Sequence, residues 1–186
     1  MRKVFEGFRF FLLAGGLMAA LALAPAAALL AQTAAASKAE VDGLETPQFE
    51  FVFEEVVTLG PSQHPGKTPF GERNIVPITG GTVTGPKIVG TVMPGGWDWQ
   101  LSVGGCNRLK ADYMIKTEDG VIINVLNHAT MCDGKDMASK VTMTSPVMEA
   151  PLGRYEWLNG GVYVGALKVT TFEGKPAVRI RIFRVY

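Results

Sequence analysis

The sequence lacks the residues and motifs on which several common chemistries depend. It holds only two His and two Cys in 186 residues, and the two His are far apart, which matches no metal-ligand spacing. There is no G-x-S-x-G motif, and no dinucleotide-binding fingerprint follows a strand. These absences argue against a metal site, a serine hydrolase of that type and a dinucleotide enzyme. No cofactor is predicted, although a site assembled from distant residues stays open.

An excess of charge of one sign is also missing. The chain has 18 basic and 17 acidic residues. Leaving out residues 1–36, which contain Arg2, Lys3, Arg9 and Glu6, gives 15 basic against 16 acidic residues. No basic run is interleaved with aromatic residues, so the sequence has no electrostatic footprint for nucleic acid, and nucleic acid is not an expected partner.

Residues 1–36 have the layout of a secretory signal peptide. Basic residues within the first nine positions precede a charge-free run over residues 10–36 that is rich in Leu and Ala. Small residues permit cleavage after Ala31 or after Ala36, so we expect a periplasmic or secreted protein. Because the apolar run is long enough to span a bilayer, an uncleaved N-terminal membrane anchor is the alternative.

The remainder of the chain has the length of one domain with a hydrophobic core. Residues 37–48 are small and polar and are expected to form a flexible lead-in, and residues 49–186 form the domain. No long amphipathic helix is predicted after Ser37; about nine or ten short β-prone runs with Gly and Pro between them remain. They predict an all-β fold, a single antiparallel β-barrel in preference to a sandwich. Closure removes exposed strand edges, and a barrel of this size can hold one small ligand.

Local patterns place several of these strands and turns. Alternation over residues 49–54 predicts a half-buried strand that runs to Leu59. Residues 60–71, rich in Pro and Gly, are predicted to be an exposed loop. A strand is predicted to begin at Tyr155 and to end in an Asn159-Gly160 hairpin turn, because Asn-Gly is a strong hairpin signal.

A second hairpin is predicted at Asp119-Gly120, which separates two β-prone runs. A two-residue turn would pair Glu118 with Val121. One face of the hairpin would then carry six residues: Tyr113, Ile115, Ile122, Asn124, Leu126 and His128.

The same register brings Cys106 and Cys132 close together at the open end of the hairpin. In an exported protein this placement predicts a disulfide. Two inert buried thiols, or a reactive thiol near His128, are the alternatives.

The densest group of functional residue types is the stretch MPGGWDWQ, residues 93–100. Trp97 and Trp99 alternate with Asp98 and Gln100, so in a regular strand the two pairs face opposite sides. Either pair could line the lumen, and we favour Asp98 and Gln100 facing inward. A purely structural interpretation also holds, in which the indoles fill the core and Asp98 ties down the Gly-Gly turn.

Several short motifs follow one another in order along residues 71–159. They are Gly71 with Arg73, Ile78-Thr79-Gly80-Gly81, Gly85-Pro86, Pro94-Gly95-Gly96-Trp97-Asp98-Trp99-Gln100, Thr117-Glu118-Asp119-Gly120 and Tyr155-Glu156-Trp157-Leu158-Asn159. Together they resemble the DUF3237 family, also called UPF0311, which is named for its uncharacterised function. The resemblance implies a calycin-like barrel with a pocket and no established reaction. His128 departs from the Gly expected there.

Two functions are consistent with these patterns, and a purely structural role is a third. The first is a barrel that binds a small hydrophobic or aromatic molecule in its lumen. The second is a cofactor-independent isomerase, cyclase or lyase, with Asp98 or Glu118 as proton acceptor, Tyr155 as hydrogen-bond donor and Arg73 holding a carboxylate or oxyanion. The expected ligand contacts are Arg73, Asp98, Trp99, Gln100, Tyr113, Tyr155 and Trp157. Both functions require Arg73, Asp98, Gln100 and Tyr155 to converge on one cavity.

Overall fold

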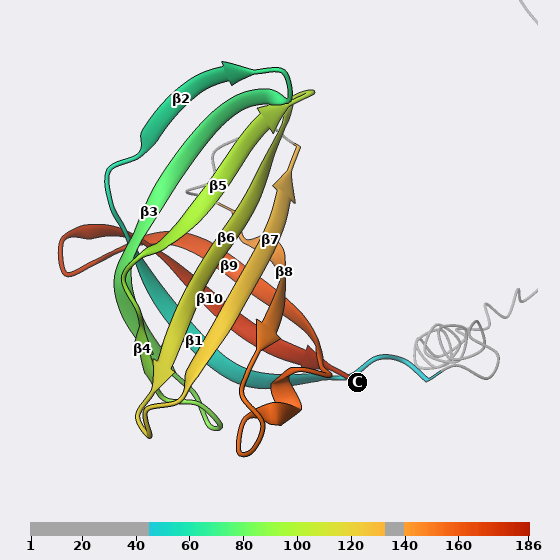
Figure 1. The fold of residues 1–186 in the computed structure, drawn as a ribbon. Coiled ribbons are helices and arrows are strands. Elements are labelled where there is room, and N and C mark those ends of the chain that lie inside the picture. Colours follow the sequence, from blue (N-terminus) through green and yellow to red (C-terminus); the bar gives the residue numbers. More distant parts are fainter. Residues whose placement is uncertain (1–44, 133–139) are drawn as a thin grey trace, which may run out of the picture. The chain divides into compact units, whose positions relative to one another are not determined.

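Short runs of β-branched and aromatic residues form ten strands and one short 3-10 helix in the computed structural model, which describes residues 45–132 and 140–186 (Figure 1). The predicted signal segment and most of the lead-in lie outside the described residues. In chain order the elements are β1 (Phe49–Leu59), β2 (Gln63–Thr68), β3 (Gly71–Thr84), β4 (Gly90–Val92), β5 (Gly96–Val103), β6 (Cys106–Thr117), β7 (Ile122–Met131), β8 (Thr142–Glu149), η1 (Glu156–Leu158), β9 (Val162–Phe172) and β10 (Lys175–Val185). None of the described helices is long and apolar enough to cross a membrane.

The strands form one antiparallel sheet that closes on itself. Their order is β1-β10-β9-β8-β7-β6-β4-β3, and β3 pairs again with β1. Strand β5 continues β4 between β3 and β6, so the closed barrel has eight strands around its wall. The predicted antiparallel β-barrel is confirmed.

Residues 93–95 interrupt the wall strand that β4 and β5 share. Gly95 has φ +109°, a conformation that side-chain-bearing residues rarely adopt, and its N–H donates to the carbonyl of Ile78 at 3.1 Å. At Gly96 an added Cβ would lie 2.5 Å from the Cβ of Tyr113. The glycine pair therefore permits the break in the strand and the close approach of β5 to β6.

The hairpin between β6 and β7 has a three-residue loop instead of the predicted two-residue turn. The Thr117 N–H donates to the carbonyl of Val121 at 2.9 Å, and Gly120 closes the loop with φ +85°. Loops of this length commonly end in a residue of left-handed conformation. Lys116 consequently pairs with Ile122, one residue away from the predicted register.

This one-residue difference corrects the predicted faces of the hairpin, because neighbouring residues of a strand point to opposite sides. The inner face carries Tyr113, Ile115, Ile123, Val125 and Asn127, all of them buried. Ile122, Asn124, Leu126 and His128 occupy the outward positions of β7, contrary to prediction. The corrected register also sets Cys106 opposite Cys132, and the two form the expected disulfide.

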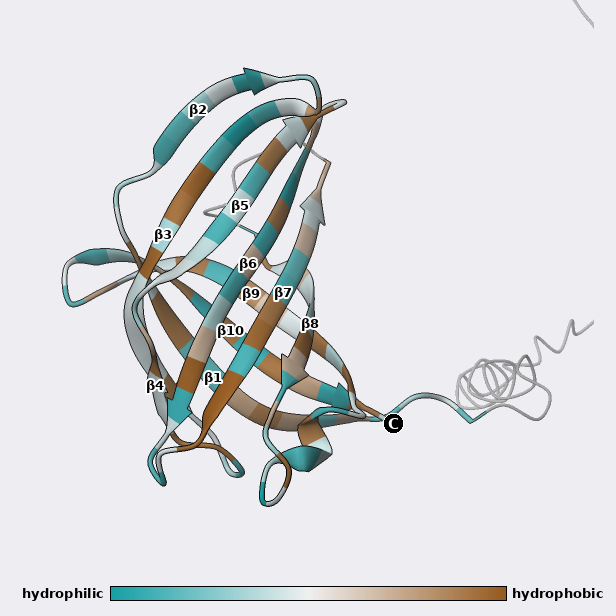
Figure 2. Ribbon diagram, viewed as in Figure 1, coloured by the Kyte–Doolittle hydropathy of each residue, from teal (hydrophilic) through white to brown (hydrophobic). Residues whose placement is uncertain are grey.

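Two further predictions about local structure are wrong. Part of the expected loop over residues 60–71 forms β2, a largely hydrophilic strand that pairs with β3 (Figure 2). The segment after Tyr155 forms η1 and not a strand. Asn159 does not close a hairpin, since its Oδ1 accepts from the Ala150 N–H at 2.7 Å and its Nδ2 donates to the Ala150 carbonyl at 3.0 Å.

The hydrophobic core lies inside the barrel and includes Leu158 of η1. Its fully buried side chains include Val52, Phe53, Ile115, Ile123, Leu158 and Ile182. Tyr155 Oη donates to Asp119 Oδ1 at 2.9 Å, which ties η1 to the β6–β7 loop.

Candidate functional site

A cavity of about 190 Å³ lies in the half of the lumen away from η1. Most of its lining is aliphatic: Val57, Leu59, Ile78, Leu109, Ala111, Ala129, Leu167, Val169, Val178 and Ile180. The remaining lining residues are Asp98, Gln100, Tyr113, Asn127, His128 and Thr144. An apolar cavity with a few polar groups has the character of a small-molecule site.

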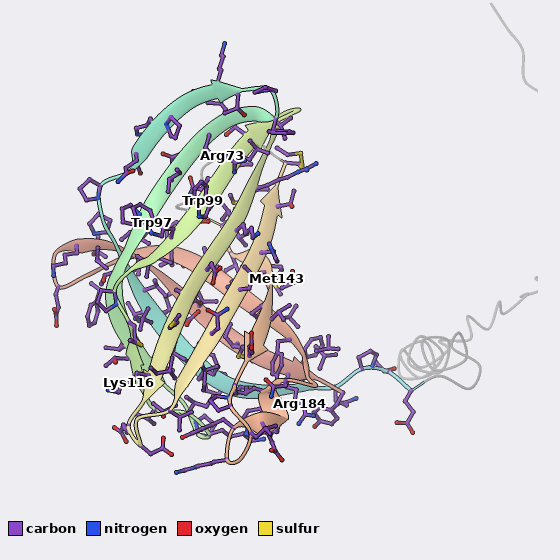
Figure 3. The ribbon with its side chains drawn as sticks, in the orientation of Figure 1. Arg73, Trp97, Trp99, Lys116, Met143 and Arg184 are labelled. Carbon is purple, nitrogen blue, oxygen red and sulfur yellow. A yellow bond between two sulfur atoms is a disulfide. The ribbon has the colours of Figure 1, made fainter. Side chains whose placement is uncertain are left out.

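Asp98 and Gln100 face this cavity, the orientation favoured from the sequence. Trp97 and Trp99 alternate with them and lie on the outer face of β5, where they are 36% and 45% exposed (Figure 3). The two indoles line a separate outer groove of about 350 Å³ together with Met114. The acid and the amide therefore belong to the lumen and the indoles do not.

Hydrogen bonds hold the Asp98 carboxyl in place. Asn74 Nδ2 donates to Gln100 Oε1 at 2.8 Å, and Gln100 Nε2 donates to Asp98 Oδ2 at 2.8 Å. The Lys110 backbone N–H donates to Asp98 Oδ1 at 3.1 Å.

Burial raises the pKa of Asp98, and the hydrogen bonds from Gln100 and from the Lys110 N–H offset part of that rise. An oriented, partly desolvated carboxyl in a cavity can both bind a donor group and move a proton.

A second acid lies deeper, behind Tyr113. Tyr113 Oη donates to Glu55 Oε1, and because β6 and β1 are not neighbours in the sheet, this hydrogen bond crosses the inside of the barrel. Burial raises the pKa of the fully buried Glu55 to about 7, although the hydrogen bond from Tyr113 acts to lower it. Burial, together with the charge of Glu55, raises the pKa of Tyr113 well above its ordinary value.

Three buried polar atoms near this pair have no hydrogen-bond partner among the described residues. They are Glu55 Oε2, Asn127 Oδ1 and Thr144 Oγ1. Asn127 and Thr144 are each only 4% exposed and both contribute to the cavity lining. Buried polar groups are normally paired, so the cavity lining at Asn127 and Thr144 has unused hydrogen-bonding capacity.

The predicted convergence of Arg73, Asp98, Gln100 and Tyr155 is wrong, because only Asp98 and Gln100 lie at the cavity. Arg73 is paired in register with Leu101, on the face of the sheet that carries Trp99 (Figure 3), and its Nη1 donates to the Gln100 carbonyl at 3.4 Å. Arg73 therefore does not hold an oxyanion in this cavity.

Three other predicted residues also lie away from the cavity. Glu118 is exposed in the β6–β7 loop. Tyr155 donates a hydrogen bond to Asp119 in the same loop. Trp157 is part of η1, and its ring packs under Lys87, whose Nζ lies 5.3 Å from the ring centroid. Tyr113, by contrast, lies at the cavity as predicted.

Sequence reasoning missed Glu55, Asn74 and Asn127. Glu55 could have been found, because it falls on the inward side of β1 between Phe53 and Val57. The predicted register places Asn127 on the face opposite Tyr113, whereas the observed register places the two on the same face. Within residues 45–132 and 140–186, no three His, Cys, Asp or Glu side chains are grouped as a metal site would require.

Comparison with known proteins gives a family and a fold. Residues 47–185 match the model of the family described as "Protein of unknown function (DUF3237)". A UPF0311 protein from Rhodopseudomonas palustris is 29% identical over 136 residues, which are 65% of this chain and 89% of the relative.

Solved structures agree with this match. A protein of unknown function from Rhodopseudomonas palustris superposes with a TM-score of 0.66 at 27% identity, over 77% of this chain and 100% of that one. A β-barrel-like protein from Acinetobacter baumannii superposes with a TM-score of 0.65 at 26% identity, over 77% of this chain and 99% of that one.

One relative in sequence is named as an enzyme. A hydroalkoxylation enzyme from Penicillium herquei is 27% identical over 113 residues, which are 61% of this chain and 69% of that enzyme.

Proposed function

This chain belongs to the DUF3237 family, and from that premise we propose that it is an exported barrel protein that binds a small, mostly apolar molecule in its lumen. The observation that carries the proposal is the cavity of about 190 Å³, aliphatic over most of its wall, with oriented polar groups at Asp98 and Tyr113. A dry apolar cavity of about 150 Å³ in another protein binds benzene, so a molecule with one ring fits this volume.

Export is the second part of the proposal. The charge-free run over residues 10–36 supports a signal peptide, and an uncleaved membrane anchor is the alternative. The disulfide between Cys106 and Cys132 favours an oxidising compartment such as the periplasm or the cell exterior. Peptide mapping of the N-terminus of the mature protein tests this part, and an intact Met1 would contradict cleavage.

Ligand binding is tested by filling the cavity. We suggest Ala111→Phe, which places a ring in the lumen from β6, and Met114→Phe as the matched control on the outer face of the same strand. Calorimetric titration with 4-ethylphenol should show binding to the wild type and to Met114→Phe, and little binding to Ala111→Phe. Equal binding by all three proteins would contradict a site in the lumen. A thermal melt of each variant verifies that it is folded.

A cofactor-independent isomerase, cyclase or lyase is the second candidate, and the position of Asp98 favours it. A buried carboxyl with a raised pKa can take a proton from one atom of a bound substrate and return it to another. The relative from Penicillium herquei named for hydroalkoxylation adds support, since adding a hydroxyl across a double bond moves a proton from oxygen to carbon. Arg73 takes no part in this reaction, because it lies on the outer face of the sheet.

Co-purification separates the binder from the enzyme. Any molecule that co-purifies with the protein would be identified by mass spectrometry and then incubated with fresh wild type and with Asp98→Asn. An enzyme should convert it, and Asp98→Asn should lose turnover while it keeps affinity. A binder should leave the molecule unchanged with either protein.

A further inference from the structure

We infer that the lumen selects uncharged ligands that donate a hydrogen bond, such as phenols and alcohols, and that it discriminates against carboxylates. This inference rests on the proposed binding function and names the chemical class that the same cavity takes. It comes from the polar groups that line the cavity and from the lack of Lys and Arg in its described lining.

Around Asp98, each side-chain hydrogen bond is donated toward the carboxyl. The amide of Asn74 donates to Gln100, and the amide of Gln100 donates to Asp98. This series of hydrogen bonds therefore ends on a carboxyl whose two oxygens each accept one protein hydrogen bond, including the one from Lys110 N–H. A carboxylate oxygen can accept more than one hydrogen bond, so Asp98 offers acceptors to a ligand.

Other polar groups inside the barrel also offer hydrogen-bonding capacity. Asn127 lines the cavity, and its Oδ1 is buried and has no partner among the described residues. Glu55 Oε2 also has no partner there; it accepts when the carboxyl is ionised and carries the proton when it is not, because Oε1 accepts from the Tyr113 hydroxyl. Thr144 Oγ1 has no partner either and can donate or accept. A ligand hydroxyl that reaches Asn127 would satisfy a buried acceptor, which is costly to leave unpaired.

Positive charge is scarce around the cavity. Its described lining contains no Lys and no Arg, and His128, which contributes to the lining, occupies an outward position of β7 between buried Asn127 and Ala129. Arg73 is on the outer face, as shown above. An anion entering the lumen would lose hydration without a matched counter-ion from the described lining and would approach the carboxyl of Asp98. Neutral donors avoid both penalties.

The test uses three probes of nearly equal size with the purified protein at pH 7. They are 4-ethylphenol, which donates a hydrogen bond, 4-ethylanisole, which cannot, and 4-ethylbenzoate, which is anionic. We expect the wild type to bind the phenol about ten-fold or more tightly than either analogue, as one good hydrogen bond to a buried acceptor implies.

Two variants localise the effect. Asp98→Asn replaces a carboxyl acceptor by an amide and should reduce the differences in affinity among the three probes. Asp112→Asn makes the same change of charge on the outer face of β6, where Asp112 is exposed, and should leave the differences in affinity among the probes unchanged.

Each result supports or overturns the inference. Equal binding of the three probes by the wild type, or tightest binding of the benzoate, would overturn the selectivity and leave binding in the lumen intact. No binding of any probe at millimolar concentration would overturn the proposed function and the inference with it. Because the comparison among probes is made on the wild type, it stands even if Asp98→Asn does not fold.

Discussion

Replacing Glu55 by Gln should remove most of the dependence of stability on pH between about pH 4.5 and pH 8. Glu55 is fully buried inside the barrel and bound by the Tyr113 hydroxyl, and burial raises its pKa from 4.5 to about 7. The folded protein therefore holds this proton more tightly than the unfolded chain does. Below pH 4.5 both states are protonated and the stabilisation is complete; as the pH rises through 7 it is lost.

The size of the effect follows from the two pKa values. A difference of one pKa unit corresponds to about 1.4 kcal/mol, so the interval from 4.5 to about 7 corresponds to about 3 kcal/mol. That is a large share of the stability of a domain, which is typically about 5–15 kcal/mol. Gln has the shape of a protonated Glu and does not ionise, so Glu55→Gln should gain about this much relative to the wild type between pH 4 and pH 8.

Urea denaturation with the disulfide intact, repeated at several pH values, measures the free energy of unfolding that this comparison needs. Asp98 also has a raised pKa, but it is present in both proteins, so the difference between them isolates Glu55. Glu54→Gln is the matched control, because Glu54 lies on the outer face with Arg179 and Arg181 and leaves Glu55 in place. If the difference between Glu55→Gln and the wild type is the same at pH 5 and pH 8.5, the reasoning is wrong.

Three further predictions concern the framework around the cavity. Reducing the Cys106–Cys132 disulfide, which closes a loop with a sequence separation of 26, should lower the free energy of unfolding by about 3 kcal/mol in denaturant melts with and without reductant, and an unchanged midpoint would contradict a structural role. Gly81→Ala places a Cβ 1.9 Å from the Val56 carbonyl oxygen and should destabilise by several kcal/mol (roughly 3 or more), whereas Gly160→Ala, with open space around it, should change the same melts by less than about 1 kcal/mol. Asn159→Ala removes both hydrogen bonds to Ala150 and should cost about 2 kcal/mol, and a cost near zero would contradict the anchoring role of Asn159.

The barrel and the separation of Asp98 and Gln100 from the two indoles could be predicted because both depend on short-range patterns. Alternation fixes which residues of a strand share a face, so Asp98 and Gln100 had to lie opposite Trp97 and Trp99 once β5 was a regular strand. Several β-prone runs separated by turn residues predicted the antiparallel sheet in the same way.

The errors arose where a distant contact or a loop geometry decided the outcome. Asp119-Gly120 is compatible with a two-residue and with a three-residue loop, and the difference of one residue exchanged the faces of β7. At Asn159 the local hairpin signal was overridden, because its amide pairs with the backbone of Ala150. The hydrogen bond between Tyr113 and Glu55 joins residues that are 58 positions apart in the sequence, so no local pattern reveals it.

The register of β3 explains why Arg73 does not reach the predicted site. Arg73 and Asn74 are neighbours on β3, and only one of them can point into the lumen. The register of β3 with β5 gives that position to Asn74, opposite Gln100. The sequence contains both residues, but the pairing partner that distinguishes them lies 26 residues away.

Methyl-detected NMR with 4-ethylphenol tests the central claim most directly, because it reports where in the barrel a ligand binds. The account predicts shift changes at methyl groups that line the cavity, such as those of Leu109 and Val169, and none at Ile122 and Val147, which are exposed on other faces. Changes confined to Ile122 and Val147, or no change at saturating probe, would contradict a ligand site in the lumen.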